Sequence, residues 1–420
     1  MIKVFKFGGA LMKDADGIRQ VSSIIKPFAN DQLIVVVSAL GKTTNDLEEI
    51  LQLSLNKKNR ELDKALGKLK QKHIHIIDQL FSDNHISRTN FLTLFDELIQ
   101  ELKHNTSDRY FSYDRIVSYG EKFSTLILHE FFKQEKLPCC PVDARVIIST
   151  DDNYTSAKIN WEKTSENVRS FVLPVLNTGE FVLTEGFIGS DSTGNTTTLG
   201  REGSDFTAAI LANILDSNEV SIWKDVSGLM NADPNRFDDC IKLDQISYHE
   251  AIELAFYGAS VIHPKTIQPL QQKNIPLFVR SFPEPDTNPS IISKDMSMDD
   301  KIHKIIVKDN QVLLSINSRD LSFIAEDHLT NIFKTFSRHK IHINLMQHSA
   351  VSFSLCFDSD KNKLEAILTD LKKDFLLKYN DGLQLITIRH YSEKVISKLV
   401  KNREVFLEQK SRSTIQVLVK

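Results

Sequence analysis

The sequence lacks the features that mark several large classes of protein. Only 4 of its 420 residues are cysteine, and their positions match neither a zinc-ligand spacing nor a disulfide framework. The net charge is −3, so we expect no cationic surface for nucleic acid or an anionic membrane. Apolar runs such as Leu33–Val37 are far shorter than the ~20 residues that span a bilayer. Because Lys3 and Lys6 interrupt the first apolar residues, we expect no signal peptide and a cytoplasmic protein.

The composition that is present is ordinary for a globular protein, with 41% hydrophobic and 25% charged residues. The length predicts about two to four domains. Met1–Phe7 is a predicted strand, a helical stretch follows to about residue 28, and Leu33–Ala39 is a second strand. The second strand is continuously apolar, which is typical of a strand buried on both faces of a parallel sheet. The early alternation of strand and helix therefore favours an α/β fold.

Residues from about 45 to 105 have helical periodicity, which predicts a helical insertion. Prolines and an asparagine between 283 and 289 form the clearest domain boundary. Beyond it, residues 305–376 have the pattern of a small β-α-β-β-α-β unit, and 377–420 have the pattern of a shortened second unit. Further strands are predicted at Arg115–Ser118, Val172–Leu176, Phe181–Glu185, Val220–Trp223 and Ile275–Arg280.

Two loops at the ends of the first strands have the composition of anion sites. In Lys6-Phe7-Gly8-Gly9, glycines allow backbone amides to approach a phosphate, and the following helix directs its positive end there. Ser38–Asn45 supplies hydroxyls and amides at the carboxyl end of the second strand, where open α/β sheets bind ligands. Taken alone, each segment is also compatible with an ordinary surface loop.

Three later segments carry charged groups with two possible uses. In Gly200–Asp205, Ser204 is predicted to cap the helix Phe206–Leu215, and Arg201 beside the helix N-terminus could clamp an anion. Upstream, Thr193–Thr198 is polar enough to form a flexible cover. Glu121 lies at a predicted helix start, where it could compensate the helix dipole or receive an ammonium group. Trp223–Pro234 follows a strand, and its Asp225 and Asp233 could position a metal–nucleotide or only form turns.

The order of these motifs resembles that of the aspartokinases over roughly residues 1–295. The resemblance implies an amino-acid kinase catalytic domain, with a mostly parallel sheet between helical layers, followed by α+β ferredoxin-like ACT regulatory domains. The matching motifs are Lys6–Gly9, Ser38 to Asn45, Ser118–Glu121, Phe187 and Gly189, Gly200–Asp205, Lys224–Gly228 with Asp233-Pro234, and Gly258–Pro264.

The resemblance also implies the reaction. ATP with Mg²⁺ would phosphorylate the β-carboxylate of L-aspartate, giving 4-phospho-L-aspartate for the lysine, threonine, methionine and diaminopimelate pathways. A carboxylate with a pKa near 3.9 is ionised at neutral pH, so the reaction needs charge neutralisation and positioning rather than a general base. The implied roles are catalysis for Lys6 and Asp205, ATP binding for Lys6, Phe7, Gly8, Gly9, Lys224, Asp225, Met230, Asp233 and Ser260, and aspartate binding for Ser38, Thr44, Glu121 and Arg201.

The sequence departs from the family pattern at several positions. Ala10-Leu11 stands where Thr-Ser is common, Ser260 where a nucleotide-binding lysine is common, and Met230 where an aromatic residue often meets the adenine. In the regulatory part, Asn344 and Ala350 each replace a common carboxylate. A lysine or threonine effector is expected there, with Asn344, Leu345 and Ser349 as its predicted contacts.

Two other functions are compatible with parts of this pattern. Ala10 and Ser260 favour a catalytically weak amino-acid-binding regulator on the same fold, whereas Lys6, Glu121 and Arg201 favour an active kinase. The other alternative is an amino-acid kinase for glutamate or acetylglutamate. Because ACT units commonly pair sheet edges or helices between chains, we also expect a homodimer or larger homo-oligomer.

Overall fold

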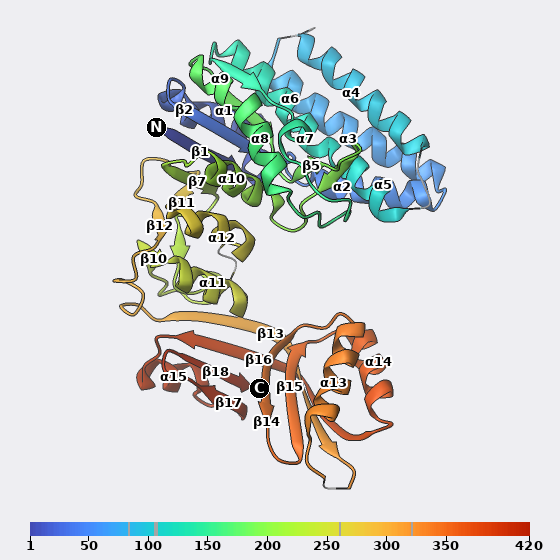
Figure 1. The fold of residues 1–420 in the computed structure, drawn as a ribbon, viewed down its shortest axis with the longest axis vertical. Helices are drawn as coiled ribbons and strands as arrows, with labels where there is room; N and C mark the ends of the chain where they lie inside the picture. The colour runs from blue at the N-terminus through green and yellow to red at the C-terminus, as the bar shows by residue number, and fades with distance from the viewer. Residues whose placement is uncertain (83–84, 105–107, 260–261, 321) are drawn as a thin grey trace. The chain divides into compact units, whose positions relative to one another are not determined.

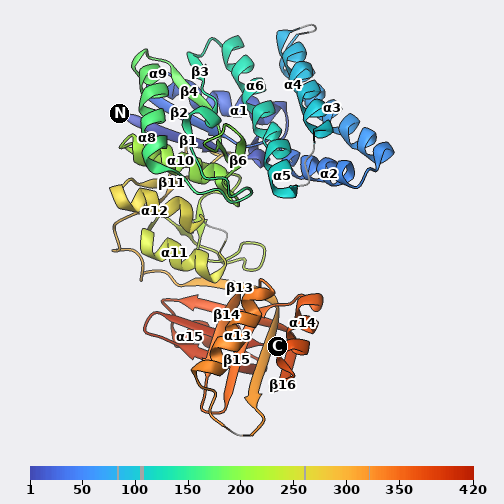
Figure 2. The same ribbon diagram turned by 45° about the vertical axis from the view of Figure 1, so that its right-hand side comes forward.

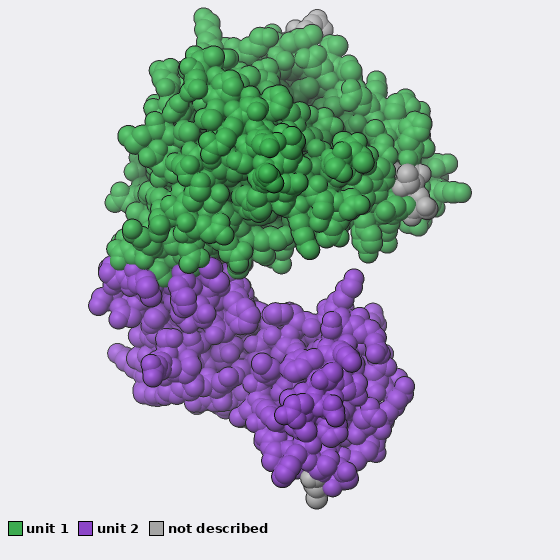
Figure 3. Space-filling view, in the orientation of Figure 1, with its two compact units in different colours: residues 1–229, 244–248, 262–295 green, residues 230–243, 249–261, 296–420 purple. Residues whose placement is uncertain are grey.

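The computed structural model describes residues 1–420 apart from 83–84, 105–107, 260–261 and 321. The chain forms two compact units that do not follow chain order (Figure 3). Unit 1 contains residues 1–229, 244–248 and 262–295, and unit 2 contains residues 230–243, 249–261 and 296–420. Each unit has its own sheet and hydrophobic core.

The central sheet of unit 1 is mostly parallel, as the buried apolar strands predict (Figure 1). Strand β1 (Ile2–Phe7) pairs in parallel with β2 (Gln32–Val37) on one side and with β7 (Glu219–Lys224) on the other. Only the β11–β12 pairing is antiparallel within the described sheet. The strand order is β10 (Gln245–Ser247), β12 (Ser290–Ser293), β11 (Leu277–Ser281), β7, β1, β2, β4 (Phe181–Glu185) and β3 (Cys139–Pro141).

Helices cover both faces of this sheet (Figures 1 and 2). On one face, Phe5, Val35 and Leu183 share a core with residues of α1 (Ala15–Ile25), α2 (Thr43–Leu55), α3 (Asn59–Leu80), α4 (Ile86–Lys103) and α6 (Tyr119–Gln134). On the other face, α10 (Gly203–Ile214) packs on β1, β2 and β7 and against α8 (Trp161–Phe171) and α12 (Pro264–Lys273). The helical segment predicted from about 45 to 105 forms α2, α3 and α4.

Two predicted strands are wrong. Arg115–Ser118 lies at the end of α5 (Arg109–Val117), a helix whose N-terminus is capped by the side chain of Asp108. Val172–Leu176 lies at the start of α9 (Leu173–Asn177), where Pro174 occupies the first turn. A proline fits a helix start but not a central strand. Short apolar runs do not distinguish a strand from a buried helix turn, which explains both errors.

Unit 2 is built around one antiparallel sheet in the order β14, β15, β13, β16, β18, β17. The long strands β13 (Lys304–Ser318) and β16 (Phe375–Arg389) pair along their length, with irregular register near residues 308–313. One core, containing Val312 and Phe375, lies under α13 (Glu326–Arg338) and α14 (Lys361–Leu371); another, containing Ile386 with Ile305 packed against it, lies under α15 (Glu393–Val400). The remaining strands are β14 (Ile343–His348), β15 (Ser352–Asp358), β17 (Val405–Lys410) and β18 (Thr414–Val419).

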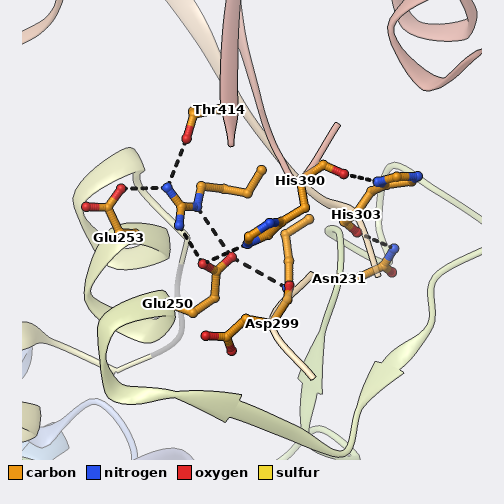
Figure 4. A network of polar contacts seen from close by, with 9 residues as sticks. Asn231, Glu250, Glu253, Asp299, His303, His390 and Thr414 are labelled. Atoms are coloured by element: carbon orange, nitrogen blue, oxygen red, sulfur yellow. Dashed lines mark hydrogen bonds and ion pairs between the residues drawn. The ribbon is translucent and has the colours of Figure 1, made fainter. Parts of the chain in front are cut away.

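A buried ionic network lies within unit 2 (Figure 4). Its centre is Glu250 on α11 (Tyr248–Tyr257), which is only 1% exposed. Arg389 Nη2 donates to Glu250 Oε2 at 2.5 Å, and Lys304 Nζ lies 3.5 Å from Glu250 Oε1. Although burial opposes its charged form, the bonds from Arg389 and the charge of Lys304 lower the pKa of Glu250. The carboxylate is therefore ionised and held by cations of its own chain.

Candidate active site

A cavity of about 460 Å³ opens in unit 1 at the carboxyl ends of β1, β2 and β4. Open α/β sheets bind ligands at this edge because loops and helix N-termini converge there. Six of the lining residues were predicted from the sequence: Lys6, Ser38, Thr44, Glu121, Arg201 and Asp205. The others are Tyr113, Thr155, Phe187, Gly200, Glu202, Gly203 and Ser204.

Lys6 and Asp205 form an ion pair in this cavity, with Lys6 Nζ 2.7 Å from Asp205 Oδ1. Lys6 lies near the end of β1, and Asp205 lies in the first turn of α10, which packs on β1. A carboxylate is favourable in the first helical turn because it compensates the helix dipole. The side chains are only 13% and 7% exposed, so the lysine ammonium is held at the edge of the sheet in a fixed position.

The glycine pair after β1 has a packing role that the sequence does not reveal. A Cβ atom on Gly9 would lie 2.1 Å from the carbonyl oxygen of Ala39, and Gly41 N donates to Gly9 O at 2.8 Å. Gly9 therefore lets the first two loops of the sheet edge pack against each other. Phe7 is fully buried and its ring stacks on Trp223 at a centroid distance of 5.8 Å, which leaves only its backbone for a ligand.

Glu121 lines the cavity and has a buried carboxyl oxygen that lacks a partner among the described residues. The residue lies in the first turn of α6 and is 3% exposed. Its Oε1 accepts a hydrogen bond from Ala39 N at 3.3 Å, while Oε2 has no hydrogen-bond partner among the described residues. Burial raises the pKa of Glu121 to about 8, and the charge of Glu185 acts in the same direction. A buried acceptor without a partner indicates a place for a ligand donor.

Arg201 reaches the cavity from a tight bend before α10. Gly200 has φ +77°, and Glu202 has φ +54°, both in the left-handed region. The predicted cap by Ser204 is wrong, because the helix begins at Gly203 and Ser204 therefore lies inside the first turn. A Cβ on Gly203 would lie 2.7 Å from Phe187 Cδ2, so this glycine is required by close packing.

Asp114 is a residue of the site that sequence reasoning missed. It is completely buried on α5 and accepts hydrogen bonds from Thr198 N and Thr198 Oγ1, both at 2.7 Å, and from Thr155 N at 3.0 Å. Burial raises the pKa of Asp114, although these bonds act in the opposite direction. Asp114 anchors the cavity wall at Thr155. Because the adjacent residues, Arg115–Ser118, were predicted as a strand, Asp114 was not expected on a helix.

The predicted flexible cover has a defined structure. Thr196–Thr198 forms β6, which pairs with β5 (Ile188–Ser190) in an antiparallel hairpin. Asp191 closes the turn by accepting from Thr193 N and Asn195 N, both at 2.9 Å. Together with the bonds to Asp114, these contacts fix the segment in place, although none of its residues is among those that line the cavity.

Of the predicted nucleotide-binding residues, only Lys6 is among the described residues that line the cavity. Lys224 ends β7, next to β1, and Asp225 follows it in unit 1. Met230 and Asp233 belong to unit 2, where Asp233 Oδ1 accepts from Asn235 N at 2.9 Å and so closes a turn. Ser260 lies outside the described residues. Their roles toward ATP stay predictions.

The predicted effector residues cluster near one edge of the sheet of unit 2. Asn344 Oδ1 accepts from Lys308 Nζ at 2.8 Å, and its Nδ2 donates to Asp358 Oδ1 at 3.0 Å. Leu345 follows it on β14 and is buried. Ser349 lies in the turn after β14 and bonds to Ser352. Their role in effector binding stays a prediction.

Comparison with known proteins identifies the class of this fold and site. Residues 1–281 match the amino acid kinase family. The chain is 30% identical over 396 residues to lysine-sensitive aspartokinase 3 of Escherichia coli, covering 92% of this chain and 86% of that protein. It is 29% identical to the chloroplastic aspartokinase 1 of Arabidopsis thaliana, covering 92% and 70% of the two chains.

Solved structures give the same result. The structure of E. coli aspartokinase III in complex with lysine and aspartate matches with a TM-score of 0.84 and 28% identity, covering all of this chain and 96% of that chain. The complex of that enzyme with aspartate and ADP matches with a TM-score of 0.82 and 27% identity. The chain therefore belongs to the amino acid kinase family.

Within that family the chain belongs to the aspartokinases, ATP-dependent phosphotransferases that form 4-phospho-L-aspartate from aspartate. The predicted fold and activity are confirmed. The relatives named above are kinases, so they give no support to a catalytically weak binding protein. Among the described residues, no helix is both long and apolar enough to cross a membrane.

Proposed function

We propose that the cavity of unit 1 holds L-aspartate in line with the γ-phosphate of ATP. The observation that carries this proposal is that Glu121, whose Oε2 has no partner among the described residues, lines the same cavity as Arg201 and the Lys6–Asp205 pair. Arg201 would clamp a substrate carboxylate, and Glu121 would accept the substrate ammonium. The hydroxyls of Ser38 and Thr44 would donate further hydrogen bonds. Each charged group of aspartate that the enzyme holds thus meets a side chain of the opposite charge.

The proposed chemistry needs no general base. The β-carboxylate oxygen attacks the γ-phosphorus as the bond to the β–γ bridging oxygen breaks, and ADP leaves with the electron pair. Lys6, held by Asp205, would stabilise the negative charge on the transferring phosphoryl group. The backbone amides of residues 7–9 would bind phosphate oxygens, with Lys224, Asp225, Met230, Asp233 and Ser260 along the rest of the nucleotide.

Mg²⁺ would arrive on the nucleotide and neutralise phosphate charge. Among the described residues there is no group of three or more His, Cys, Asp or Glu side chains that could hold a metal. Mg²⁺ binds through phosphates, water and one or two carboxylates rather than through a protein cage, so the nucleotide would supply its main ligands. The proposed location of the reaction is the cytoplasm.

The test of the substrate site is ADP release from MgATP with L-aspartate or L-glutamate. Aspartate should support turnover, glutamate should not, and Arg201→Ala should lower kcat/KM for aspartate by about 10²-fold or more. Arg88→Ala, which removes only an exposed ion pair with Asp78, is the matched control and should keep the wild-type rate. A folded wild-type enzyme without aspartate-dependent turnover would overturn the proposal.

We also propose regulation by lysine or threonine through unit 2, at Asn344, Leu345 and Ser349, in a homo-oligomer that pairs ACT-like units. The E. coli relative is named lysine-sensitive, and its structure was solved with lysine. In unit 2, β14 is an edge strand whose Met346 is 53% exposed, which leaves an edge available for pairing. Sedimentation showing only the 47.9 kDa monomer at micromolar concentration would contradict the assembly.

A further inference from the structure

A second buried carboxyl group lies behind the proposed ammonium site. Glu185 is the last residue of β4, pairs in register with Val37 of β2, and is 7% exposed. Because side chains alternate along a strand, Glu185 lies on the same face as Phe181 and Leu183, which share the core with α6. The ring of Phe181 packs against Phe132 of α6 at 5.6 Å. Glu185 therefore faces the helix whose first turn carries Glu121.

Among the described residues, neither carboxyl group forms an ion pair with a lysine, arginine or histidine. Glu185 Oε2 accepts from Ala144 N at 2.9 Å, which is the only side-chain bond found for it among the described residues. Lys6, whose charge acts on Glu121, is held by Asp205. Around Glu185, Arg145 is held by Asp143 at 2.5 Å. The charged and titratable groups that act on the pair are Lys6, Tyr113, Lys122, Asp143 and Arg145.

The electrostatics of the two groups follow from this geometry. Burial raises the pKa of Glu185 to about 7, and the charge of Asp143 adds to the effect. Burial also raises the pKa of Glu121, and Glu185 is the acidic neighbour that adds to it. Glu185 lies opposite Val37, and Glu121 is bonded to Ala39 N two residues further along, so both buried carboxyl groups lie at one edge of the sheet. Like charges in a buried site oppose each other's ionisation, so the two groups titrate as a coupled pair.

We propose that Glu185 is a positioning residue that keeps a proton at the empty ammonium site, so that aspartate binding releases this proton. The inference rests on the proposed role of Glu121. When the substrate ammonium enters, the O–H bond of the carboxyl pair breaks and the proton passes to solvent. The carboxylate left behind accepts a charge-assisted hydrogen bond from the ammonium, and no other bond changes. Affinity for aspartate should therefore rise with pH.

Calorimetry of aspartate binding tests proton release directly. Heats are measured at pH 7 in two buffers with different ionisation enthalpies, without ATP. Wild-type enzyme should release close to one proton per aspartate at pH 7 and almost none at pH 9. Succinate, which keeps both carboxylates of aspartate but lacks the ammonium, should bind without release.

Kinetics of Glu185→Gln then test the residue. In the wild type, a Glu121 pKa of about 8 predicts a KM for aspartate about tenfold higher at pH 7 than at pH 9. In Glu185→Gln this ratio should fall to about threefold or less. Glu130→Gln, at a buried carboxylate further along α6, is the matched control and should keep the wild-type ratio.

The outcomes separate the inference from the proposed function. Aspartate binding without proton release, or an unchanged pH profile in a folded Glu185→Gln enzyme, overturns the inference and leaves the substrate site standing. No aspartate binding at any pH overturns both. A wild type that binds aspartate without proton release overturns the inference whether or not Glu185→Gln folds.

Discussion

Two buried glutamates, one in each unit, have opposite surroundings. Glu250 in unit 2 is bound by Arg389, Lys304 and His390, and its pKa is lowered (Figure 4). Glu121 in unit 1 accepts one backbone amide, and its pKa is raised to about 8. The difference shows that burial alone does not mark a functional carboxylate. The sign of the pKa shift and the number of partners separate a structural charge from one that awaits a ligand.

The two surroundings also have different energetic consequences. Removing a partner from a satisfied buried pair leaves an uncompensated charge, which destabilises the fold. Removing the charge of an unsatisfied carboxylate relieves a cost that is already present in the folded state. Substitutions in the two units should therefore change stability in opposite directions, which makes the comparison testable.

The largest expected effect is that of Arg389→Met in unit 2. Glu250 would lose its bidentate partner, and Glu253 would lose a bond of 2.8 Å, so unit 2 should be destabilised by about 3–5 kcal/mol. Both tryptophans, Trp161 and Trp223, lie in unit 1. In urea, far-UV circular dichroism should therefore report early unfolding, while tryptophan fluorescence changes less.

Arg338→Met is the control for this substitution, because Arg338 forms only an exposed pair with Asp370. It should change stability by less than about 1 kcal/mol. If Arg389→Met were no more damaging than Arg338→Met, the network around Glu250 would not be the structural centre that its contacts indicate.

A smaller effect of opposite sign is expected for Glu121→Gln in unit 1. Folding raises the pKa of Glu121 from 4.5 to about 8, so the unfolded chain releases this proton at lower pH. Folding stability is therefore lost as pH rises from about 4.5 to 8, and the neutral amide should avoid this loss. We expect the variant to be more stable than the wild type by about 1–3 kcal/mol at pH 8 and by almost nothing at pH 4.5.

The stabilised Glu121→Gln enzyme should bind aspartate poorly, because the neutral amide cannot form an ion pair with the substrate ammonium. Urea midpoints from tryptophan fluorescence at the two pH values, together with KM for aspartate, measure both effects. A variant that is less stable at pH 8 than at pH 4.5, relative to the wild type, would show that the carboxylate is already neutralised inside the protein.

The smallest effect is expected for Asp114→Asn. An amide retains one acceptor oxygen for the bonds from Thr198 and Thr155 but loses their charge assistance. We expect a loss of about 1 kcal/mol in stability and a rise of a few-fold in KM for aspartate, with kcat nearly unchanged. Steady-state kinetics at saturating ATP measure both constants, and a collapse of kcat instead would place Asp114 closer to the chemistry than the geometry indicates.

The sequence predicts those parts of the site that depend on local patterns. Lys6 and Ser38 follow from apolar strands that end in polar loops, and Arg201 from a glycine-containing helix start, whereas the role of Asp205 came only from the resemblance to the aspartokinases. Asp114 and Glu185 could not be found in this way, because their roles come from contacts between segments far apart in the chain. Glu185 in particular appears in the sequence only as the polar end of an apolar strand.

The fold of the C-terminal region was predictable in its elements but not in their grouping. The sequence predicts separate units at 305–376 and 377–420. In the structure, Ile305 and Val307 instead pack in the core of Ile386 and Val417. The first two residues lie in the first predicted unit, whereas Ile386 and Val417 lie in the second. Such a grouping is set by strand pairing between distant residues, for which a single sequence carries no local signal.

The long strands β13 and β16 have a consequence for cooperativity. Each strand contributes both to the core of Val312 and to the core of Ile386, and the two strands pair with each other along almost their whole length. If the part of unit 2 around one of these two cores were removed, the part around the other would therefore keep an unpaired strand edge and an incomplete core. The two parts should unfold together as a single cooperative unit, and a substitution that destabilises one end of the β13–β16 pairing should also destabilise the other end.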